Sequence, residues 1–296
     1  MTFKDLCVDA IDAERLGTFW AGALGLELRA AGADSNGDVK LIGPTERHTI
    51  WINAVPEPKT VKHRWHLDLN VESVEQLTRL GATVVDSDSF PWTVMADPEG
   101  GEFCAFVREG AITQRLYEIG VDCGNSAQEC HAVASWWAEK LGGHLVDSDE
   151  GYSYVDAIPE APFDSLDFVP VPEPKTVKNR IHLDVYGDVD ELIAAGATVL
   201  ARGRAGRASG RCWPIRRATS SASSRRRRRT GSGSGKRRET TATRARSREN
   251  YESRSNTIAI PWPPPTHMVS RPNCLSWVWR LFSSVAVMRA PVMPNG

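Results

Sequence analysis

Strand-like and helix-like hydrophobic patterns alternate through the first part of the chain. Apolar and polar residues alternate over residues 5–10, the period of a half-buried strand. Asp12 then offers an N-cap to a helix over 13–24, where apolar side chains recur at helical spacing, and Gly25 is placed to end that helix. Two short strands are predicted to follow, over 39–42 and 49–53.

A second strand and helix repeat this order. A strand over 65–71 is followed by a helix over 73–80, which Gly81 stops. Three further strands are predicted over 82–85, 92–96 and 102–107. The segment Asp97-Pro-Glu-Gly-Gly101 has the residue types of a turn between the last two. The pattern therefore predicts two successive βαβββ units.

The chain also contains a long internal repeat. VPEPKTVKHRWHLDL at Val55–Leu69 recurs as VPEPKTVKNRIHLDV at Val171–Val185, and flanking matches keep nearly the same offset. Two homologous modules are therefore predicted, over 1–110 and 111–201, each of ordinary domain size. Strands of the second module are expected at Tyr117–Asp122, Gly151–Val155, Phe163–Val169 and Arg180–Tyr186.

Three phrases of the first module carry a family resemblance. They are FWAGALGLE after the first strand, HLDLNV at the start of the second half and WTVMADPEGGEFC at its end. With the tandem βαβββ halves, they resemble the vicinal oxygen chelate (VOC) superfamily of glyoxalases, bleomycin-resistance proteins and extradiol dioxygenases, and most of all its small glyoxalase-like domains. The resemblance covers 3–107 and part of 117–200. It implies an α+β fold of tandem modules, each built from paired βαβββ units, with the second module incomplete.

Charge divides the chain into two parts. The whole sequence of 296 residues has a formal charge of −1, but residues 1–201 hold 15 basic and 34 acidic residues, or −19, and residues 202–296 hold 21 and 3, or +18. We expect a cytoplasmic protein without a secretory signal or membrane span. No CxxC motif is present, so Cys7, Cys104, Cys123 and Cys130 are predicted to be cytosolic thiols.

The basic part takes the place of the last strands of the second module. Nucleotides that encode Ser209–Ala222 can, in another reading frame, encode Trp-Thr-Val-Leu-Ala-Asp-Pro-Glu-Gly-Asn-Glu-Phe-Cys, which resembles Trp92–Cys104. Residues 202–296 are therefore predicted to be a disordered, frameshifted tail. The alternative is a basic arm selected to bind nucleic acid; as a shifted tail it would bind nucleic acid only non-specifically.

Strand alternation selects the side chains that face the concave side of each sheet. Leu67, Leu69 and Val71 form an apolar face, so the polar residues between them point to the other side. Residues 1–110 are predicted to form a paired βαβββ cup in which His66 lies near Asp5 on the concave side. The inward residues of the first module are predicted to be Asp5, Cys7, Asp9, His66, Asp68, Asn70, Glu102, Cys104 and Phe106.

The resemblance implies one divalent metal in such a cup, of the Zn, Fe, Mn or Ni type. His66 occupies the position of a family histidine ligand, with Asp5 and Cys104 in two other ligand positions. The counterparts in the second module are His182, Glu118 and Asp184. Glu102 is the predicted proton-transfer residue, and the expected ligand contacts are Asp68, Asn70, Trp51 and Trp92. The alternative for His66 is a structural histidine that bonds Asp5 or Asp68.

The sequence leaves the activity open. One hypothesis is a metal-dependent lyase, isomerase or dioxygenase acting on a small oxygenated substrate. A second is a metal-free protein that binds or sequesters a small molecule, and a third is a non-functional frameshift product. Lys59 and Lys175 either guide an anionic ligand to the cup or belong to a solvated loop. The family pairs modules within or between chains, so a homodimer is compatible with the sequence.

Overall fold

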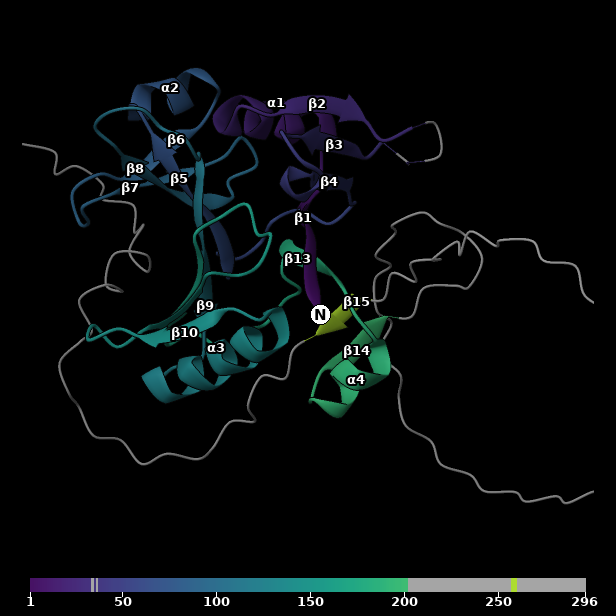
Figure 1. Cartoon of the computed structure of the whole chain (residues 1–296). Coiled ribbons are helices and arrows are strands. Elements are labelled where there is room, and N and C mark those ends of the chain that lie inside the picture. Colours follow the sequence, from purple (N-terminus) through teal and green to yellow (C-terminus); the bar gives the residue numbers. More distant parts are fainter. Residues whose placement is uncertain (33–34, 36, 202–256, 260–296) are drawn as a thin grey trace, which may run out of the picture.

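The structure, a computed structural model, describes residues 1–32, 35, 37–201 and 257–259 (Figure 1). The first module contains two units, and both follow the predicted order. Unit 1 consists of β1 (Thr2–Ala10), α1 (Ala13–Leu24), β2 (Glu27–Ala30), β3 (Val39–Ile42), a 3₁₀ turn (Glu46–His48) and β4 (Ile50–Ala54). Unit 2 consists of β5 (Trp65–Val71), α2 (Val74–Arg79), β6 (Thr83–Asp86), β7 (Thr93–Ala96) and β8 (Glu102–Val107).

The second module repeats this order and then changes. Unit 3 consists of β9 (Leu116–Cys123), α3 (Ala127–Leu141), β10 (His144–Asp147), β11 (Ser153–Asp156) and β12 (Ser165–Pro170). Unit 4 begins with β13 (Ile181–Tyr186), α4 (Val189–Ala194) and β14 (Thr198–Ala201). A distant strand, β15 (Thr257–Ala259), then pairs with β14.

Local chemistry explains where the first helix begins and ends. The Asp12 carboxylate accepts a hydrogen bond from the Arg15 backbone N–H, so the expected N-cap is formed. Gly25 closes the helix with a φ of 70°, in the left-handed region that a glycine adopts without a Cβ clash. Ser126 and Gly142 have the same roles at the two ends of α3.

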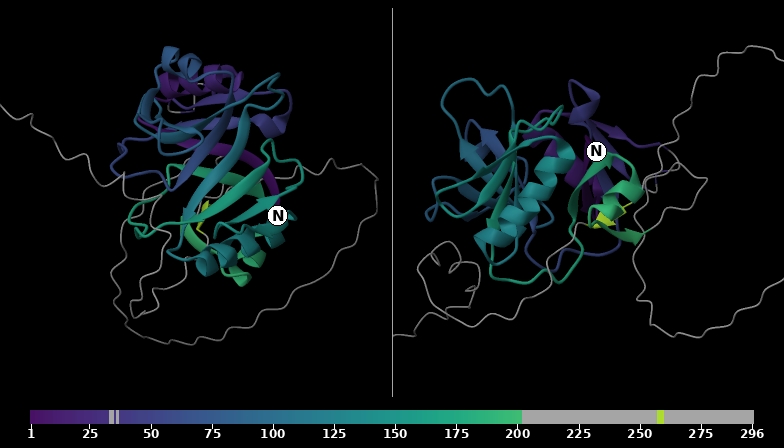
Figure 2. Two further views of the ribbon diagram at one scale, coloured as in Figure 1. Left: turned by 90° about the vertical axis from the view of Figure 1, so that its left-hand side faces the viewer. Right: turned by 60° about the horizontal axis from the view of Figure 1, so that its bottom comes forward.

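The four units pair crosswise between the two modules, and the expectation of one cup within each module is wrong. β1 of unit 1 pairs antiparallel with β13 of unit 4, and β5 of unit 2 pairs antiparallel with β9 of unit 3. The five-stranded sheet has the order β13-β1-β4-β3-β2, and the eight-stranded sheet has the order β10-β11-β12-β9-β5-β8-β7-β6. Figure 2 shows the ribbon from two further sides. His66 and Asp5 therefore belong to different sheets.

The two crossed pairs use the same register. Cys7 lies opposite His182 in the smaller sheet, and Gly120 lies opposite His66 in the larger one. Asp5 likewise faces Asp184, as Glu118 faces Asp68. The halves are thus related by an internal pseudo-symmetry, and a residue in one half can be compared directly with its counterpart in the other.

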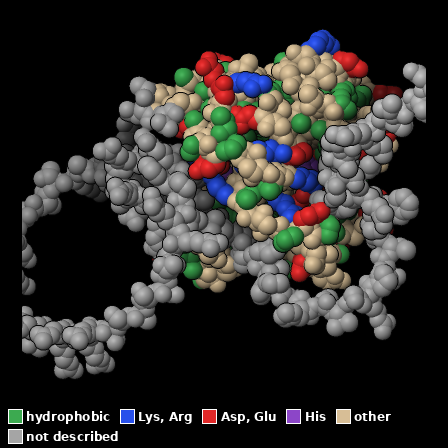
Figure 3. Space-filling view, turned by 180° about the vertical axis from the view of Figure 1, so that it is seen from behind, with side chains coloured by type: hydrophobic (Ala, Val, Ile, Leu, Met, Phe, Trp, Pro, Cys, Tyr) green, Lys and Arg blue, Asp and Glu red, His purple; other side chains and the backbone are tan. Residues whose placement is uncertain are grey.

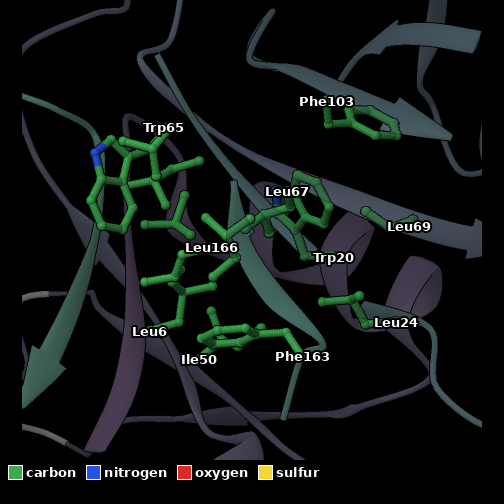
Figure 4. Packing of buried hydrophobic residues seen from close by; sticks show 14 of the residues in the cluster. Leu6, Trp20, Leu24, Ile50, Trp65, Leu67, Leu69, Phe103, Phe163 and Leu166 are labelled. Carbon is green, nitrogen blue, oxygen red and sulfur yellow. The ribbon is translucent and has the colours of Figure 1, made fainter. Parts of the chain in front are cut away.

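Aromatic side chains of two helices pack against strands of neighbouring units. Trp20 of α1 packs edge-on against Phe103 of β8 at a centroid distance of 5.2 Å, which joins units 1 and 2 of the first module (Figure 4). Trp137 of α3 lies 5.8 Å from Trp65 of β5, which joins unit 3 of the second module to unit 2 of the first. Fully burying one large apolar side chain contributes about 1.5–3 kcal/mol. The helices therefore link units both within the first module and between the two modules.

The cysteines and the tail differ in part from expectation. Cys123 at the end of β9 and Cys130 in the first turn of α3 form a disulfide, so they are not the thiols that were predicted. Cys7 and Cys104 form no disulfide among the described residues. In the predicted tail, Thr257–Ala259 pair with β14, which contradicts a tail without any structure. The rest of that tail, and the frameshift inferred for it, lie outside the described residues.

The described helices and surface bear on the expectations for membrane insertion and for nucleic acid binding. No helix among the described residues is long and apolar enough to cross a membrane. On the face seen from behind, basic side chains lie among acidic and hydrophobic ones (Figure 3). The described part of this face is therefore not a uniformly basic surface of the kind that binds a nucleic acid backbone.

Candidate functional site

The crossed pairing divides the predicted site residues between two sheets. His66, Asp68, Asn70, Cys104 and Trp92 lie on or beside the eight-stranded sheet, where Glu118 joins them. Asp5, Cys7 and Trp51 lie on the five-stranded sheet with His182 and Asp184. Each polar group therefore draws residues from both modules, and we call them the larger-sheet site and the smaller-sheet site.

A histidine, a carboxylate and a thiol meet in the larger-sheet site. His66 Nδ1 and Asp68 Oδ1 are 2.7 Å apart, and Asp68 lies opposite Cys104 on β8. One potential ligand atom from each of these three residues lies within 4.8 Å of the others. A nitrogen, an oxygen and a sulfur donor are thus already gathered at one point, as Zn or Fe would require.

A glycine makes room for the histidine ring. A Cβ built on Gly120 would lie 2.1 Å from His66 Cε1 and 2.3 Å from Nε2, far inside van der Waals contact. The counterpart in the other half is Cys7, which has a Cβ at the same register position opposite His182. The larger-sheet site is therefore shaped for the ring in a way that the smaller-sheet site is not.

Two acidic side chains of the second module complete the larger-sheet site. Glu118 of β9 lies opposite Asp68, and Asp167 of β12 lies beside Gly120 on the other edge of β9. The sequence prediction included Glu118 but missed Asp167. Its signal was the alternation of Asp167 with the buried Leu166 and Phe168, which places it on the polar face with Glu118.

The surroundings of the larger-sheet site raise the pKa of its half-buried carboxyl groups. Burial, then repulsion from Asp167 and Asp68, raises the pKa of Glu118 to about 8. Burial also raises the pKa of Asp167 to about 6. The pKa of His66 is raised although burial opposes its charge, because Asp68 stabilises the imidazolium. Burial and the adjacent Asp68 raise the pKa of Cys104 to about 11, so it is a thiol when no cation is near.

Aromatic rings form one wall beside these polar groups. Trp92 stacks on Phe90 with a centroid distance of 5.1 Å and on Phe106 with 5.3 Å, and Phe106 meets Tyr117 edge-on. The register of β9 shifts next to Tyr117, and such a bulge re-aims a side chain. Trp92 thus belongs to a stack of rings with Phe90 and Phe106.

One arginine lies against this wall. The Arg108 guanidinium is 4.7 Å from the centre of the Tyr117 ring and 5.1 Å from that of Phe106. Its Nε donates to Asn70 Oδ1 at 2.7 Å, so Asn70 orients the guanidinium. Asn70 was expected to contact a ligand directly, and in the structure its amide already bonds Arg108 and the Gln114 carbonyl.

The smaller-sheet site has a different chemistry. Trp51 Nε1 donates to the buried Asp5 carboxylate at 3.2 Å, and Lys4 Nζ lies 3.1 Å from the same oxygen. Cys7, His182 and Asp184 again place potential ligand atoms within 4.8 Å of one another. Trp51 stands at the position that Asp167 has in the larger-sheet site. Trp51 and Lys4 therefore take the places that Asp167 and Tyr117 have in the larger-sheet site. The smaller-sheet site consequently has fewer oxygen donors.

Glu102 does not have the surroundings expected of a proton-transfer residue. Its Oε1 accepts from Lys59 Nζ at 2.7 Å and its Oε2 from the His63 backbone N–H at 3.0 Å. Although burial works against ionisation, these two donors lower the pKa of Glu102. Both oxygens are occupied, so Glu102 anchors the loop that carries Lys59. Lys59 is accordingly bound to that carboxylate and does not extend toward a ligand.

A match to a family model over two thirds of the chain identifies the family. The model of the glyoxalase-like domain matches residues 5–106 and again 118–213. The chain belongs to the glyoxalase-like domain family. Its fold class is accordingly the α+β arrangement of tandem VOC segments that the resemblance implied. In this glyoxalase-like chain the second match ends at residue 213, which corresponds to Pro98 by the spacing of Gly81 and Gly196. The match therefore does not reach a counterpart of β8.

Solved structures similar to this glyoxalase-like chain include several relatives of low identity. Glyoxalase I from Zea mays is 15% identical with a TM-score of 0.48, over 67% of this chain and 82% of that one. A putative dioxygenase from Bacillus subtilis is 14% identical with a TM-score of 0.47, over 69% and 78%. A glyoxalase/bleomycin resistance protein/dioxygenase family enzyme from Burkholderia phytofirmans is 15% identical, with 0.27, over 36% and 97%. A search of curated proteins found no match.

Proposed function

We propose that the larger-sheet site binds a divalent metal ion and that the protein is a metal-dependent enzyme acting on a small oxygenated substrate. His66, Asp68 and Cys104 would hold the metal. Three protein ligands leave coordination positions for a substrate, as in catalytic rather than structural sites. The observation that carries the proposal is that donors of three chemical types lie within 4.8 Å of one another on adjacent strands, with the carboxyl groups of Glu118 and Asp167 on the strands beside them.

The residues present fit a cation. Asp68, Glu118 and Asp167 face one imidazole, and the pKa values of the last two are raised, first by burial and then by repulsion from neighbouring carboxylates. A divalent ion would offset that repulsion and would lower the pKa of the Cys104 thiol. When bound, such an ion supplies Lewis-acid polarisation of a substrate oxygen.

The other residues of the site suit proton transfer and orientation. Glu118, with a pKa of about 8 in the metal-free chain, holds a proton on its carboxyl near neutral pH and is our candidate acid or base in place of Glu102. Arg108, held by Asn70 and by two rings, is suited to orient an anionic group of the substrate. The rings that include Trp92 and Phe106 exclude water from that side.

Metal titration of the full chain tests this proposal. Cobalt(II) added to metal-free protein should produce a thiolate-to-cobalt absorption band. His66→Ala and Cys104→Ser should remove that band, whereas His182→Ala in the smaller-sheet site is the matched control and should retain it. Binding that persists in both larger-sheet variants, or that is lost in His182→Ala, contradicts the assignment.

A second function is favoured by the aromatic wall. Four rings and an arginine can hold a planar small molecule without any metal, as a binding or sequestering protein does. The two functions differ in their response to a chelator. A small molecule that quenches tryptophan fluorescence equally before and after EDTA treatment, and less in Trp92→Leu, supports the metal-free function.

A further inference from the structure

Among the described residues, unit 4 has no strand that corresponds to β8 of unit 2. In the eight-stranded sheet, β8 lies between β5 and β7, parallel to β5 and antiparallel to β7. The corresponding edge of β13 has no partner among the described strands, because β13 is the last strand of its sheet. The second family match also stops before the position where β8 would begin. An open sheet edge of this kind accepts an added strand.

The strand β15 corresponds to β7 of unit 2, although it comes from a distant part of the chain. Thr198, Val199 and Ala201 pair with Ala259, Ile258 and Thr257, and the register shifts between Val199 and Ala201. In unit 2 the pairs are Thr83 with Ala96, Val84 with Met95 and Asp86 with Val94, with a shift at the same point. β15 therefore stands where a copy of β7 would be, and no described strand takes the place that β8 has between β5 and β7.

Two cations beside this position lack the acidic partners that their counterparts have. In the complete half, Arg180 binds Glu99 at 3.3 Å and Lys59 binds Glu102 at 2.7 Å, and both acids belong to the turn and start of β8. Their repeats are Arg64 and Lys175. The Nη1 of Arg64 is buried without a hydrogen-bond partner, and no ion pair is formed by Lys175 within the described part of the chain.

We propose that the open edge of β13 is a docking site for one extended strand of another polypeptide, which runs parallel to β13 and begins with an acidic turn like Asp97–Gly101. Backbone hydrogen bonds to β13 would hold the strand. Arg64 and Lys175 would bind its two glutamates, as Arg180 and Lys59 bind Glu99 and Glu102. The partner is thus defined by an Asp-Pro-Glu-Gly-x-Glu turn followed by alternating apolar residues.

A labelled peptide that copies residues 97–107, with Cys104→Ser, tests this with the full chain. Fluorescence anisotropy should show saturable binding. The protein variant Lys175→Glu should weaken binding about tenfold, and the peptide variant Glu102→Lys should restore binding to that protein. Lys140→Glu on α3, a lysine whose partner Glu139 lies on the same helix, is the control and should leave the affinity unchanged.

The outcomes are distinct. A reciprocal rescue between Lys175→Glu and the Glu102→Lys peptide supports the assigned contact. Absence of binding, or equal affinity of the unmodified peptide for wild type and Lys175→Glu, overturns the proposal. Association of the chain with itself, abolished by the peptide, also overturns it, because the edge would then be filled by a second copy.

Discussion

The fit between Gly120 and the His66 ring gives a sharp test of the larger-sheet site. In Gly120→Ala, the new methyl group would lie 2.1 Å from His66 Cε1, whereas ordinary contacts begin near 3.4 Å. The ring must leave its position, and with it the 2.7 Å contact to Asp68. The variant should therefore lose both stability and the cobalt(II) band expected of the metal site.

The magnitude follows from two opposing terms. Gly120 has no positive φ, so alanine alone would stabilise the chain by about 0.4–1 kcal/mol through the unfolded state. Overpacking against the ring costs about 1–3 kcal/mol. We expect net destabilisation in wild type and stabilisation in a His66→Ala background. The stabilising term is common to both backgrounds and cancels, so the coupling energy between the two positions should equal the overpacking cost of about 1–3 kcal/mol.

Urea unfolding of the four variants of this cycle measures the coupling. The control cycle combines Gly120→Ala with His182→Ala, which lies in the other sheet, and its coupling should be close to zero. The reasoning is refuted if Gly120→Ala destabilises the chain equally with and without the His66 ring. A stable variant that still shows the cobalt(II) band would refute the role of ring position in metal binding.

Three further predictions concern other groups of the chain. The folded state retains the proton of Glu118 up to pH about 8, whereas the unfolded state loses it near pH 4.5. In EDTA the free energy of unfolding should therefore fall as pH rises between these two values, and it should fall less in Glu118→Gln. Reduction of Cys123–Cys130, or the double change to serine, should destabilise the chain by about 2–3 kcal/mol from the short loop it closes, seen in urea unfolding with and without dithiothreitol. Glu102→Gln should lower the free energy of unfolding in urea by about 1 kcal/mol, because it weakens the contacts to the loop that carries Lys59, but it should leave the cobalt(II) band unchanged. Loss of the band would instead support the role first predicted for Glu102 in the site.

Local patterns predicted the elements well because their causes are local. Alternation in β5 and β13 placed His66 and His182 on the polar face, and the caps Asp12 and Gly25 ended α1 where expected. The disulfide was missed because the end of β9 and the first turn of α3 approach only in the folded chain. Asp167 was missed although its strand was predicted, because only the pairing of β12 with β9 places it beside Gly120.

The crossed pairing was beyond reach for a different reason. β5 and β13 carry nearly the same sequence, so β1 finds equivalent backbone register and equivalent side chains on either strand. Strand alternation therefore cannot choose between pairing within a module and pairing across modules. The loop lysines do not choose either, because Lys178 binds Asp9 and Lys62 binds Asp122, each at 2.7 Å and each across the modules, and the two lysines and the two aspartates occupy equivalent positions of the repeat.

These lysines also explain how two repeats can share one sequence and still form different sites. The loop lysines and arginines are the same in both modules, so the scaffold is held symmetrically by Lys62, Lys178 and their two aspartates. The positions that differ face the polar side of the sheets, where Gly120 replaces Cys7 and Asp167 replaces Trp51. Changes there leave the strand register intact while they change the donors offered to a ligand. Chemistry in one sheet could thus diverge from the other without loss of the fold, which is why the metal is assigned to the larger-sheet site alone.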